Sequence, residues 1–463
     1  MNTKALRQKI LDLAIHGKLV PQDPNDEPAS VLLERIKAEK ERLIKEGKIK
    51  RTKRSKAACD KPHYPYELPE GWCWTTIEDV CSKIGSGSTP KGSNYSKEGI
   101  PFFRSQNVQN FGIVLSDIKY ISEEVHQSMK GTEVIANDLL LNITGGSLGR
   151  CAVVPINFKI GNVSQHVCIL RTVLVKPEYL HCFILSSFFA KSMKITGSGR
   201  EGLPKYNLEK MLFPLPPIHE QERIIIEVKQ LRNYINKLDT CRGNLIELVS
   251  QAKSKVLDLA IHGKLVPQDP SDEPASELLK RINPKAEITC DNPHYRNLPK
   301  GWAVCRLEDI VEIFDNLRKP INSNERNSRI ANKHKEELYP YYGATGQVGL
   351  IDAYLIDGTY LLLGEDGAPF LDKSAVKAYP IEGKCWVNNH AHILKPLCDF
   401  DYLMFYLNQV DYKDYVNGST RLKLTQSDMR SILVLLPPIA EQKRISAKVR
   451  ALFDLLDSIV YHL

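Results

Sequence analysis

Apolar side chains recur at alternating steps of four and three residues along a long stretch near the middle of the chain. A mean spacing of about 3.5 residues is typical of a helix whose apolar stripe packs against another helix in a coiled coil. We therefore predict one helix from Ile218 to His262, with an interruption of the stripe at Arg242 and Gly243. The apolar positions of this stripe are Ile224, Val228, Leu231, Ile235, Leu238, Leu245, Val249, Ala252, Val256 and Leu259.

Both ends of the chain show the same spacing. Pro216–Pro217 and Pro437–Pro438 stand where two of the expected helices begin, and proline is tolerated in the first turn of a helix. The terminal segments therefore predict further coiled-coil helices. Their apolar positions are Leu6, Ile10 and Leu13 near the N-terminus, and Ile445, Val449, Leu452, Leu456, Ile459 and Leu463 near the C-terminus.

The segments between these helical stretches have a different pattern. Residues 67–215, named insert 1 here, and residues 298–436, named insert 2, contain short apolar runs such as CAVV (151–154) and TYLLLG (359–364). Polar loops rich in glycine and serine separate the runs. This pattern predicts compact α+β or β-rich domains whose loops are available for function.

The chain contains the same plan twice. Residues 9–36 and 255–282 align over 28 positions and differ at only four of them. Between the repeated segments the two inserts diverge strongly, so a nearly constant frame holds two variable domains. The other repeated segments are 63–72 with 294–302, 197–207 with 418–428, and 214–224 with 435–445.

The register of the repeats makes the plan circular. Residue 463 aligns with residue 242, and residue 1 aligns with residue 247. The C-terminal helix followed by the N-terminal helix thus corresponds to the single central helix. We expect an α+β protein with a circularly repeated, pseudo-two-fold architecture, in which a long antiparallel coiled coil joins the two inserts and places them at its opposite ends.

These patterns predict the domain boundaries. The two inserts are the variable domains, and the remaining segments form the frame and its linkers. In chain order, we expect an N-terminal helical region (1–47), a basic linker (48–66), insert 1 (67–215), a central coiled-coil helix with a short helix (216–282), a linker (283–297), insert 2 (298–436) and a C-terminal helix (437–463).

Composition narrows the class of protein. With 463 residues, 42% hydrophobic and 25% charged, the chain is typical of a globular protein with two or three domains. No apolar run reaches the roughly 18–20 residues of a membrane span, and the N-terminus lacks the apolar core of a secretory signal. The eleven cysteines form no CxxC pair, so we expect reduced thiols in the cytoplasm and no metal site.

Positive charge is concentrated in one place. Residues 37–56 carry ten Lys/Arg and three Glu, and so account for nearly all of the net charge of +8. Such a run binds nucleic-acid phosphates in some proteins and is a solvated helix end in others. The polar loops of the inserts are rich in Arg, Asn, Gln, Ser and Thr, the residue types that read base edges in DNA.

Several motifs resemble those of one protein family. IPFFRSQNV (100–108), ANDLLLNITGGSLGR (136–150) and SQHVCILR (164–171) are similar to the target recognition domain of type I restriction–modification specificity subunits. YPYYGATGQVG (339–349), LLLGEDGAPF (361–370) and NNHAHILKP (388–396) resemble a second subtype of that domain. The LPPI-x-EQ-x-RI helix starts at 215–224 and 436–445 also match, so the resemblance covers nearly the whole chain.

The resemblance implies a function without catalysis in this chain. Each recognition domain would read one half of a split, asymmetric double-stranded DNA target. The coiled coil would set the spacing and bind two methyltransferase subunits, and restriction–translocase subunits would join that core. S-adenosylmethionine, ATP and Mg²⁺ would be bound by the partner subunits rather than by this chain.

Polar and basic residues in the family-like loops are the candidate DNA contacts. For Asn107, Asn389 and the residues near them, a buried hydrogen-bonding role is the alternative. In insert 1 the candidates are Ser88, Thr89, Lys91, Tyr95, Arg104, Gln106, Asn107, Ser147, Arg150, Arg200 and Lys205; in insert 2 they are Arg318, Lys319, Arg329, Tyr342, Thr345, Gln347, Asn388, Asn389, Arg421 and Lys423.

Two other functions are alternatives: an enzyme that itself cuts or methylates DNA, and a free-standing DNA-binding regulator. Asn292-Pro293-His294-Tyr295 is similar to an amino-methyltransferase motif, but the other copy has Lys61-Pro62-His63-Tyr64 and no cofactor-binding glycine motif accompanies either. Asp26 with Glu46 and Lys48 fits a nuclease motif loosely, and the second copy lacks it. No phosphate-binding GK[ST] loop is present.

Overall fold

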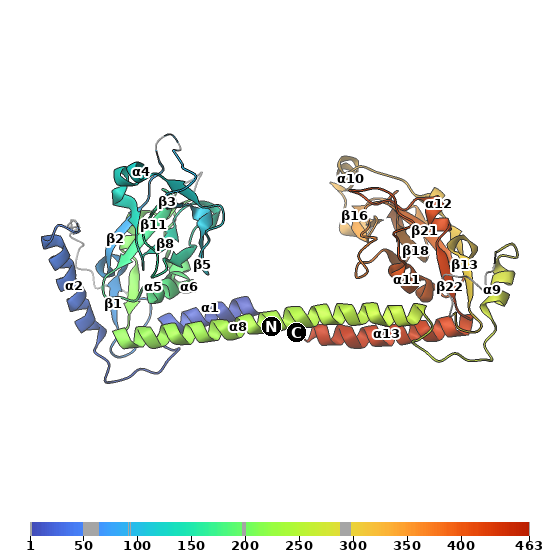
Figure 1. Cartoon of the computed structure of the whole chain (residues 1–463), viewed down its shortest axis with the longest axis horizontal. Helices are drawn as coiled ribbons and strands as arrows, with labels where there is room; N and C mark the ends of the chain where they lie inside the picture. The colour runs from blue at the N-terminus through green and yellow to red at the C-terminus, as the bar shows by residue number, and fades with distance from the viewer. Residues whose placement is uncertain are drawn as a thin grey trace. The chain divides into compact units, whose positions relative to one another are not determined.

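The computed structural model describes residues 2–49, 64–90, 92, 94–196, 201–287 and 298–462. These residues form two compact units, Met1–Thr240 (unit 1) and Cys241–Leu463 (unit 2). In both units, helices and strands are mixed (Figure 1). No helix in the described ranges is long and apolar enough to cross a membrane.

Unit 1 consists of frame helices and insert 1. The helix α8 (Ile218–Ile261, 44 residues) begins in unit 1 and ends in unit 2. The other elements of unit 1 are α1 (Thr3–Ile15), α2 (Ala29–Lys45), β1 (Cys73–Thr76), α3 (Ile77–Val80), β2 (Cys81–Ser86), β3 (Ile100–Phe103), β4 (Val108–Gln109), β5 (Gly112–Ile113), β6 (Lys119–Ile121), α4 (Glu123–Ser128), β7 (Glu133–Val134), β8 (Leu139–Asn142), β9 (Cys151–Val153), β10 (Gly161–Val163), β11 (Val167–Thr172), α5 (Pro177–Ile184), α6 (Ser187–Ser192), α7 (Lys205–Glu209) and β12 (Leu212–Leu215).

Unit 2 has a closely corresponding order of elements. It contains α9 (Ala275–Ile282), β13 (Ala303–Arg306), β14 (Val311–Ile313), α10 (Ser323–Ile330), β15 (Tyr339–Tyr342), β16 (Gln347–Ile351), β17 (Ile356–Asp357), β18 (Tyr360–Gly364), β19 (Ala378–Ile381), β20 (Lys384–Val387), β21 (Ala391–Pro396), α11 (Phe400–Gln409), α12 (Gln426–Arg430), β22 (Leu433–Leu436) and α13 (Ile439–Tyr461).

The two inserts share one sheet topology although their sequences diverge. In insert 1 the four-stranded sheets run β6-β3-β10-β7 and β2-β11-β8-β9; in insert 2 they run β16-β15-β20-β17 and β14-β21-β18-β19. In each insert one central pair is parallel, β3 with β10 and β15 with β20. The first and last strands of each insert also pair, β1 with β12 and β13 with β22. The described parts of the inserts therefore use one fold to present different loops.

The long helix ends within one residue of its predicted limits, and it continues through Arg242 and Gly243. In unit 1, α1 lies along α8, and Arg7 bonds Asp239 at 2.7 Å (Figure 1). In unit 2, α13 lies along the later part of α8, and Lys253 bonds Asp457 at 2.7 Å.

Burial along the predicted stripe is uneven. Ile224, Val228 and Ile235 are buried, whereas Leu238 is 47% exposed and Leu6 is 38% exposed. We had predicted both leucines to face a partner helix. Leu6 lies in the first turns of α1 and Leu238 lies on α8 next to Asp239, the partner of Arg7, and both side chains stay partly exposed there.

Equivalent hydrogen bonds anchor each insert to the frame. In unit 1, the indole of Trp72 donates to Glu220 at 2.9 Å and Gln22 donates to the same carboxylate at 3.0 Å. The neighbouring Gln221 donates to the Pro216 carbonyl and accepts from the backbone N–H of Lys176, both at 3.0 Å. These bonds give the repeated PPI-x-EQ sequence a structural role: its Glu and Gln fasten the start of the helix to the insert.

Unit 2 repeats these bonds. Trp302 donates to Glu441 at 3.0 Å, and Gln268 donates to it at 3.1 Å. Gln442 accepts from the backbone N–H of Asp399 at 2.9 Å. Burial raises the pKa of Glu441, and it does the same for Glu220 in unit 1.

A glycine ends each helix that leads into the insert. Gly17 has φ of +63° and Gly263 has φ of +65°, the left-handed region that glycine adopts at little cost. A Cβ atom would lie 2.4 Å from Pro69 at the first position and 2.5 Å from Pro299 at the second. The repeated IHGK and LPxGW segments thus pack against each other and need a glycine at the point of contact.

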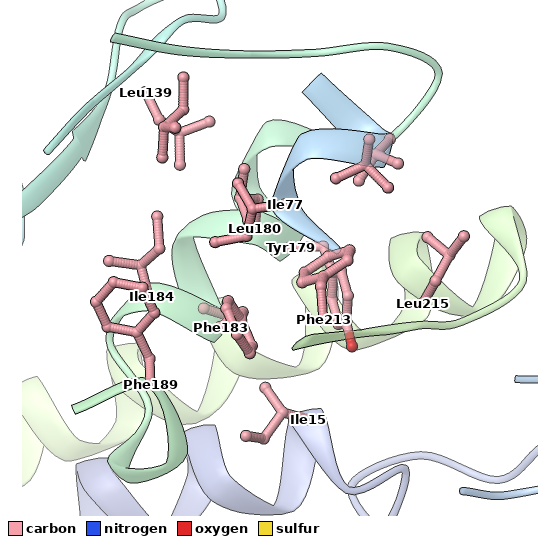
Figure 2. Close-up of a cluster of buried hydrophobic side chains, with 14 of the residues drawn as sticks. Ile15, Ile77, Leu139, Tyr179, Leu180, Phe183, Ile184, Phe189, Phe213 and Leu215 are labelled. Atoms are coloured by element: carbon pink, nitrogen blue, oxygen red, sulfur yellow. The ribbon is translucent and has the colours of Figure 1, made fainter. Parts of the chain in front are cut away.

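The hydrophobic core of unit 1 joins frame and insert. Ile15 of α1 lies beneath the aromatic cluster of insert 1, in which Phe183 packs against Phe189 and Phe213, and Phe213 packs against Tyr179 (Figure 2). All five side chains are buried. Because the frame contributes to the core of the insert, the insert is held in a fixed orientation on its own frame helix.

Candidate nucleic-acid interface

Several candidate loops of insert 1 meet at one edge of its sheets. The loop after β8 reaches the loop after β3, because the amide of Asn142 donates to the carbonyl of Ser105 at 2.8 Å. The loop after β2 passes closely over the end of β10, where a Cβ on Gly87 would lie 1.9 Å from the carbonyl oxygen of Val163. Loops separated by up to 76 residues in sequence thus form one surface.

Two candidates on this surface share a carboxylate. Arg104 Nη2 donates to the carbonyl of Asp117 at 2.6 Å and to its carboxylate at 3.0 Å, and Gln106 donates to that carboxylate at 2.7 Å. The hydrogen bond from Arg104 lowers the pKa of Asp117. Asp117 therefore orients both side chains, of which Gln106 is exposed and Arg104 is 26% exposed.

The loop after β8 carries two more candidates. The N–H of Arg150 donates to the carbonyl of Ser147 at 3.1 Å, which closes a tight turn. The N–H of Gly145 donates to the carbonyl of Glu201 at 3.1 Å, so the turn lies beside the segment that leads to Lys205. Arg150 and Lys205 are both exposed and give this edge positive charge.

Insert 2 brings its candidate loops together at the equivalent strand ends. The N–H of Lys319 donates to the carbonyl of Val387 at 3.2 Å, and the N–H of Asn388 donates to the carbonyl of Tyr342 at 3.1 Å. Thr345 lies in the turn after β15 that the bond from Gly343 to Gly346 closes. The loops after β14, β15 and β20 therefore adjoin.

A network of charges underlies this surface in insert 2. Arg318 bonds Glu365, and also Asp315 at 3.1 Å. His392, fully buried, bonds Asp315 at 2.7 Å, and Lys423 bonds Glu365 at 3.3 Å. Burial alone would raise the pKa of Asp315, but the bond from His392, together with the charges nearby, lowers it. Arg421 lies at the edge of the network and bonds Asp366 at 2.6 Å.

The structure sorts the candidates by exposure. Most have side chains at the surface, where DNA could reach them. The exposed ones are Thr89, Tyr95, Gln106, Arg150, Lys205, Lys319, Thr345, Gln347, Asn389, Arg421 and Lys423, and the partly exposed ones are Ser88, Arg104, Ser147, Arg318, Arg329 and Tyr342.

Two candidates are buried instead. Asn107 is 1% exposed; its amide donates to the carbonyl of Val114 at 3.0 Å and its oxygen accepts from the N–H of Arg104 at 3.0 Å. Asn388 is 7% exposed and accepts from the N–H of His390 at 2.8 Å. Both amides hold their own loops from within the protein, which is the buried hydrogen-bonding role given as the alternative for these positions.

Other candidates have local partners or lie outside the described residues. Arg329 bonds Asp352 at 2.6 Å and stacks on Trp386 at 5.1 Å, which fastens α10 to the sheet. Tyr95 packs on Phe102 at 5.7 Å. Lys91 and Arg200 lie outside the described residues.

The sequence did not reveal Asp117, Asp315 or His392. Asp117 is 13 positions from Arg104 but in a different loop, and Asp315 and His392 are 77 positions apart. The pairing of β14 with β21 brings Asp315 and His392 together. A correct prediction of this strand register would have identified the pair.

The described part of the basic run is largely engaged within the chain. Lys40 donates to the carbonyls of Glu78 and Asp79 at 2.6 and 3.2 Å, and Arg42 bonds Glu39 at 2.6 Å. These contacts favour a solvated helix end, in which α2 runs to Lys45 and a turn follows it. Residues 50–56 lie outside the described residues.

The candidate catalytic motifs have a different use where they are described. Asp26, of the loose nuclease motif, bonds Arg223 at 2.6 Å and is part of the frame. Within the described ranges, no group of three or more His, Cys, Asp or Glu residues could hold a metal ion. The methyltransferase-like segment 292–295 lies outside these ranges.

The chain contains two domains of one topology. Each domain has polar and basic loops at one end of its sheets and is fastened to a repeated helical frame. This architecture is expected of a protein that recognises a two-part nucleic-acid site. Residues 69–248 and 299–459 match the type I restriction modification DNA specificity domain. Because these matches cover more than half of the chain, the chain belongs to this family of type I restriction–modification specificity subunits.

Curated relatives and solved structures agree with this assignment. The chain is 34% identical over 381 residues to the specificity subunit of the type I restriction enzyme EcoAI from Escherichia coli. The alignment covers 67% of this chain and 63% of the EcoAI subunit. The chain is 25% identical over 553 residues to the EcoEI specificity subunit from Escherichia coli, covering 98% and 90%.

Two solved structures share the fold. One, from a study of complex assembly in a type I restriction–modification system, has a TM-score of 0.57 at 18% identity and covers 86% of this chain and 94% of that chain. The other is the HsdS subunit from Thermoanaerobacter tengcongensis, with a TM-score of 0.50 at 18% identity, covering 85% and 92%.

Proposed function

We propose that this chain is the DNA-recognition subunit of a type I restriction–modification complex and that it has no catalytic activity of its own. Insert 1 reads one half of a bipartite double-stranded DNA target, and insert 2 reads the other half. The observation that carries the proposal is the contrast between the inserts: one sheet topology, but different side chains at the edge where the loops meet. A shared fold with unlike contacts is what an asymmetric two-part target requires.

We further propose that the frame helices form an antiparallel, pseudo-two-fold coiled coil that sets the distance between the inserts. The order of contacts in unit 1 supports the antiparallel direction. Arg7 contacts Asp239 and Gln22 contacts Glu220, so residue numbers increase along one segment as they decrease along α8. In unit 2 the pair Gln268–Glu441 takes the place of Gln22–Glu220. Two methyltransferase subunits would dock on this frame, and restriction–translocase subunits would join them.

The partner subunits would supply the chemistry. S-adenosylmethionine would be the methyl donor on the methyltransferase subunits, and ATP with Mg²⁺ would act on the restriction–translocase subunits. This chain would bind DNA, fix its register and hold the two half-sites at the required spacing.

Reconstitution tests the proposal. The full chain is incubated with random-sequence duplex DNA, S-adenosylmethionine, ATP and Mg²⁺, alone and together with the methyltransferase subunits of its host. Methylation at one two-part sequence is expected only in the mixture. Methylation or cleavage by the chain alone would establish an enzyme instead, and specific binding without any association with the methyltransferase would establish a free-standing regulator.

A further inference from the structure

The strand registers make the two inserts comparable residue by residue. In insert 1, Leu141 of β8 is opposite Cys168 of β11, and in insert 2, Leu363 of β18 is opposite His392 of β21. The residues that follow β8 and β18 therefore correspond. Thr144 of insert 1 takes the place of Asp366 of insert 2.

The segments that form β-bridges with Thr144 and Asp366 also correspond between the two inserts. Thr144 forms a β-bridge with Gly202, and Asp366 forms one with Lys423. Two residues before each of these, the repeated GSxR segments place an arginine in both inserts, Arg200 and Arg421. An arginine present in both copies cannot by itself make the two half-sites different, so the difference has to come from its neighbours.

In insert 2 those neighbours hold the arginine firmly. Arg421 Nε bonds Asp366 Oδ1 at 2.6 Å. The guanidinium lies against Gly367, where an added Cβ would be 3.1 Å from Nε and 3.6 Å from both Cζ and Nη2. Gly367 has φ of +77°, and its N–H donates to the carbonyl of Leu422 at 3.0 Å. This bond joins the loop of Gly367 to the segment that carries Arg421.

The loop that carries the carboxylate is itself held in place. His390 Nδ1 lies 3.4 Å from Asp366 Oδ2 without a hydrogen bond between them. The adjacent Glu365 accepts from Arg318 and Lys423, and its backbone carbonyl accepts from the N–H of Leu424 at 2.7 Å. Asp366 therefore stands in a loop with few alternative positions.

The outer end of the arginine remains open. The Arg421 side chain is 60% exposed, and its nearest atom to Asp366 is Nε. With Nε engaged by the carboxylate and Nη2 beside Gly367, the exposed guanidinium offers Nη1 and Nη2 as a two-pronged donor. Guanine presents two acceptors, O6 and N7, in the major groove at the spacing that such a donor matches.

Insert 1 has different chemistry at the same place. Thr144 carries a neutral hydroxyl, which lies 2.9 Å from Nδ1 of His166. A neutral hydroxyl can accept a hydrogen bond from a guanidinium but cannot form an ion pair with it, so the ion pair that Asp366 makes with Arg421 has no equivalent at Thr144.

We propose that Asp366 is a specificity-positioning residue, which together with Gly367 fixes the guanidinium of Arg421 so that it reads a guanine in the second half-site. This inference rests on the proposed function of the chain as a DNA-recognition subunit. It assigns the base-specific role to the pair of Arg421 with Asp366 and not to the repeated arginine alone.

The test uses the full chain in complex with its methyltransferase subunits. The wild-type target is first identified by selecting bound duplexes from a randomised library. Affinities are then measured for that target, for duplexes with each base pair of the second half-site replaced in turn, and for random duplex DNA. The variants are Arg421→Lys, Asp366→Asn and Asp366→Thr. Glu308→Gln is the matched control, because it removes a carboxylate from another arginine pair of insert 2, Glu308–Arg430 at 3.3 Å.

Arg421→Lys keeps the charge but loses the two-pronged donor. We expect it to weaken binding to the target about 5- to 150-fold and to abolish discrimination at one G·C pair, with little change on random DNA. Asp366→Asn and Asp366→Thr should lose discrimination at that same pair, while binding to random DNA stays the same or tightens, because a negative charge near the phosphates is gone. Glu308→Gln should keep the wild-type profile.

The outcomes separate this inference from the proposed function. If the wild-type complex selects no sequence, the proposed function fails. If it selects a sequence but the Asp366 variants keep full discrimination, Asp366 has no positioning role and the inference is wrong. A uniform loss on all duplexes, with unchanged thermal unfolding, would make Arg421 a phosphate contact and would also overturn it. A loss of discrimination at every pair of the half-site would indicate a general distortion of insert 2.

Discussion

At the scale of single residues, the anchor between frame and insert depends on a few buried polar bonds. Trp302 is 4% exposed and Glu441 is 1% exposed, so water cannot replace a bond lost between them. We expect Trp302→Phe to lower the free energy of unfolding by about 1–3 kcal/mol, because the buried carboxylate loses a donor. Chemical denaturation of the full chain measures this. Trp72→Phe should have a similar effect, and replacement of the exposed Tyr461 by Phe should have none. Equal stability of both Trp variants and the wild type would mean that the indole bond contributes nothing.

The same anchor predicts a dependence on pH. Burial raises the pKa of Glu441 above its ordinary value of 4.5. A raised pKa in the folded state means that the protonated carboxyl favours folding below the ordinary pKa, and that this contribution is lost as the pH rises through the folded-state pKa. Glu441→Gln should therefore become more stable relative to the wild type as the pH rises from about 4.5. Thermal unfolding between pH 4 and pH 7 measures the difference. Glu247→Gln on the exposed face of α8 is the control, and a constant difference at all pH values would contradict the prediction.

Arg104 is the strongest candidate base contact in insert 1, because Asp117 orients it in a loop that Asn107 supports from beneath. If its guanidinium binds a guanine with two hydrogen bonds, Arg104→Ala should weaken binding to the target by about 1–3 kcal/mol and relax the preference at one base pair of the first half-site. Binding measurements with base-substituted duplexes show this. An equal loss on target and random DNA would make Arg104 a phosphate contact, and no loss would place it outside the interface.

The sequence predicted which loops carry polar residues better than it predicted the role of each residue in them. The family-like motifs fall on loops of the inserts, and most of their candidate residues are at the surface. The sequence could not show that Asn107 turns inward to cap its own loop, or that Asp315 meets His392, since both depend on contacts between distant segments. Within these loops, the sequence alone does not distinguish a buried asparagine from an exposed one.

At the scale of elements, α8 was predictable and the strand order was not. Helical periodicity is a local signal, and the Pro-Pro start together with the glycine after the helix marks its limits to within one residue. The parallel pairs β3–β10 and β15–β20 join strands separated by a long stretch of chain, so periodicity alone does not specify them. The common topology of the inserts became visible only from the paired strands.

The common topology predicts that the inserts are interchangeable units. Replacement of residues 73–213, which begin with β1 and end in β12, by the corresponding insert of a relative should change one half of the DNA target and leave the other half intact. The ends of the exchanged segment lie side by side, because Cys73 pairs with Leu215. Mapping methylated sites in a host that carries the hybrid measures both halves. Simultaneous change of both halves would show that the inserts do not read independently.

At the scale of the whole molecule, the frame repeats its contacts as well as its sequence. Asp26 bonds Arg223 in unit 1, and Asp272 bonds Arg444 in unit 2, at positions that the repeat register makes equivalent. Each insert is therefore attached to the frame in the same way. The helix α8 begins in unit 1 and ends in unit 2, and in the proposed frame its length would set the distance between the inserts.

Lengthening that helix tests whether it sets the spacing of the half-sites. Insertion of four helix-forming residues after Leu245 should move one insert by about 6 Å and rotate it by about 40° relative to the other. Both anchors lie outside the insertion, so each insert should keep its own base preference. We expect the DNA spacer between the half-sites to lengthen, or specific binding to be lost if no spacer length matches the new rotation. Selection from duplex libraries with spacers of variable length distinguishes these results. Four residues inserted in the exposed Asp23–Asn25 turn, which leave α8 unchanged, are the control and should preserve the original spacer. An unchanged spacer after the insertion in α8 would show that the helix does not set the distance.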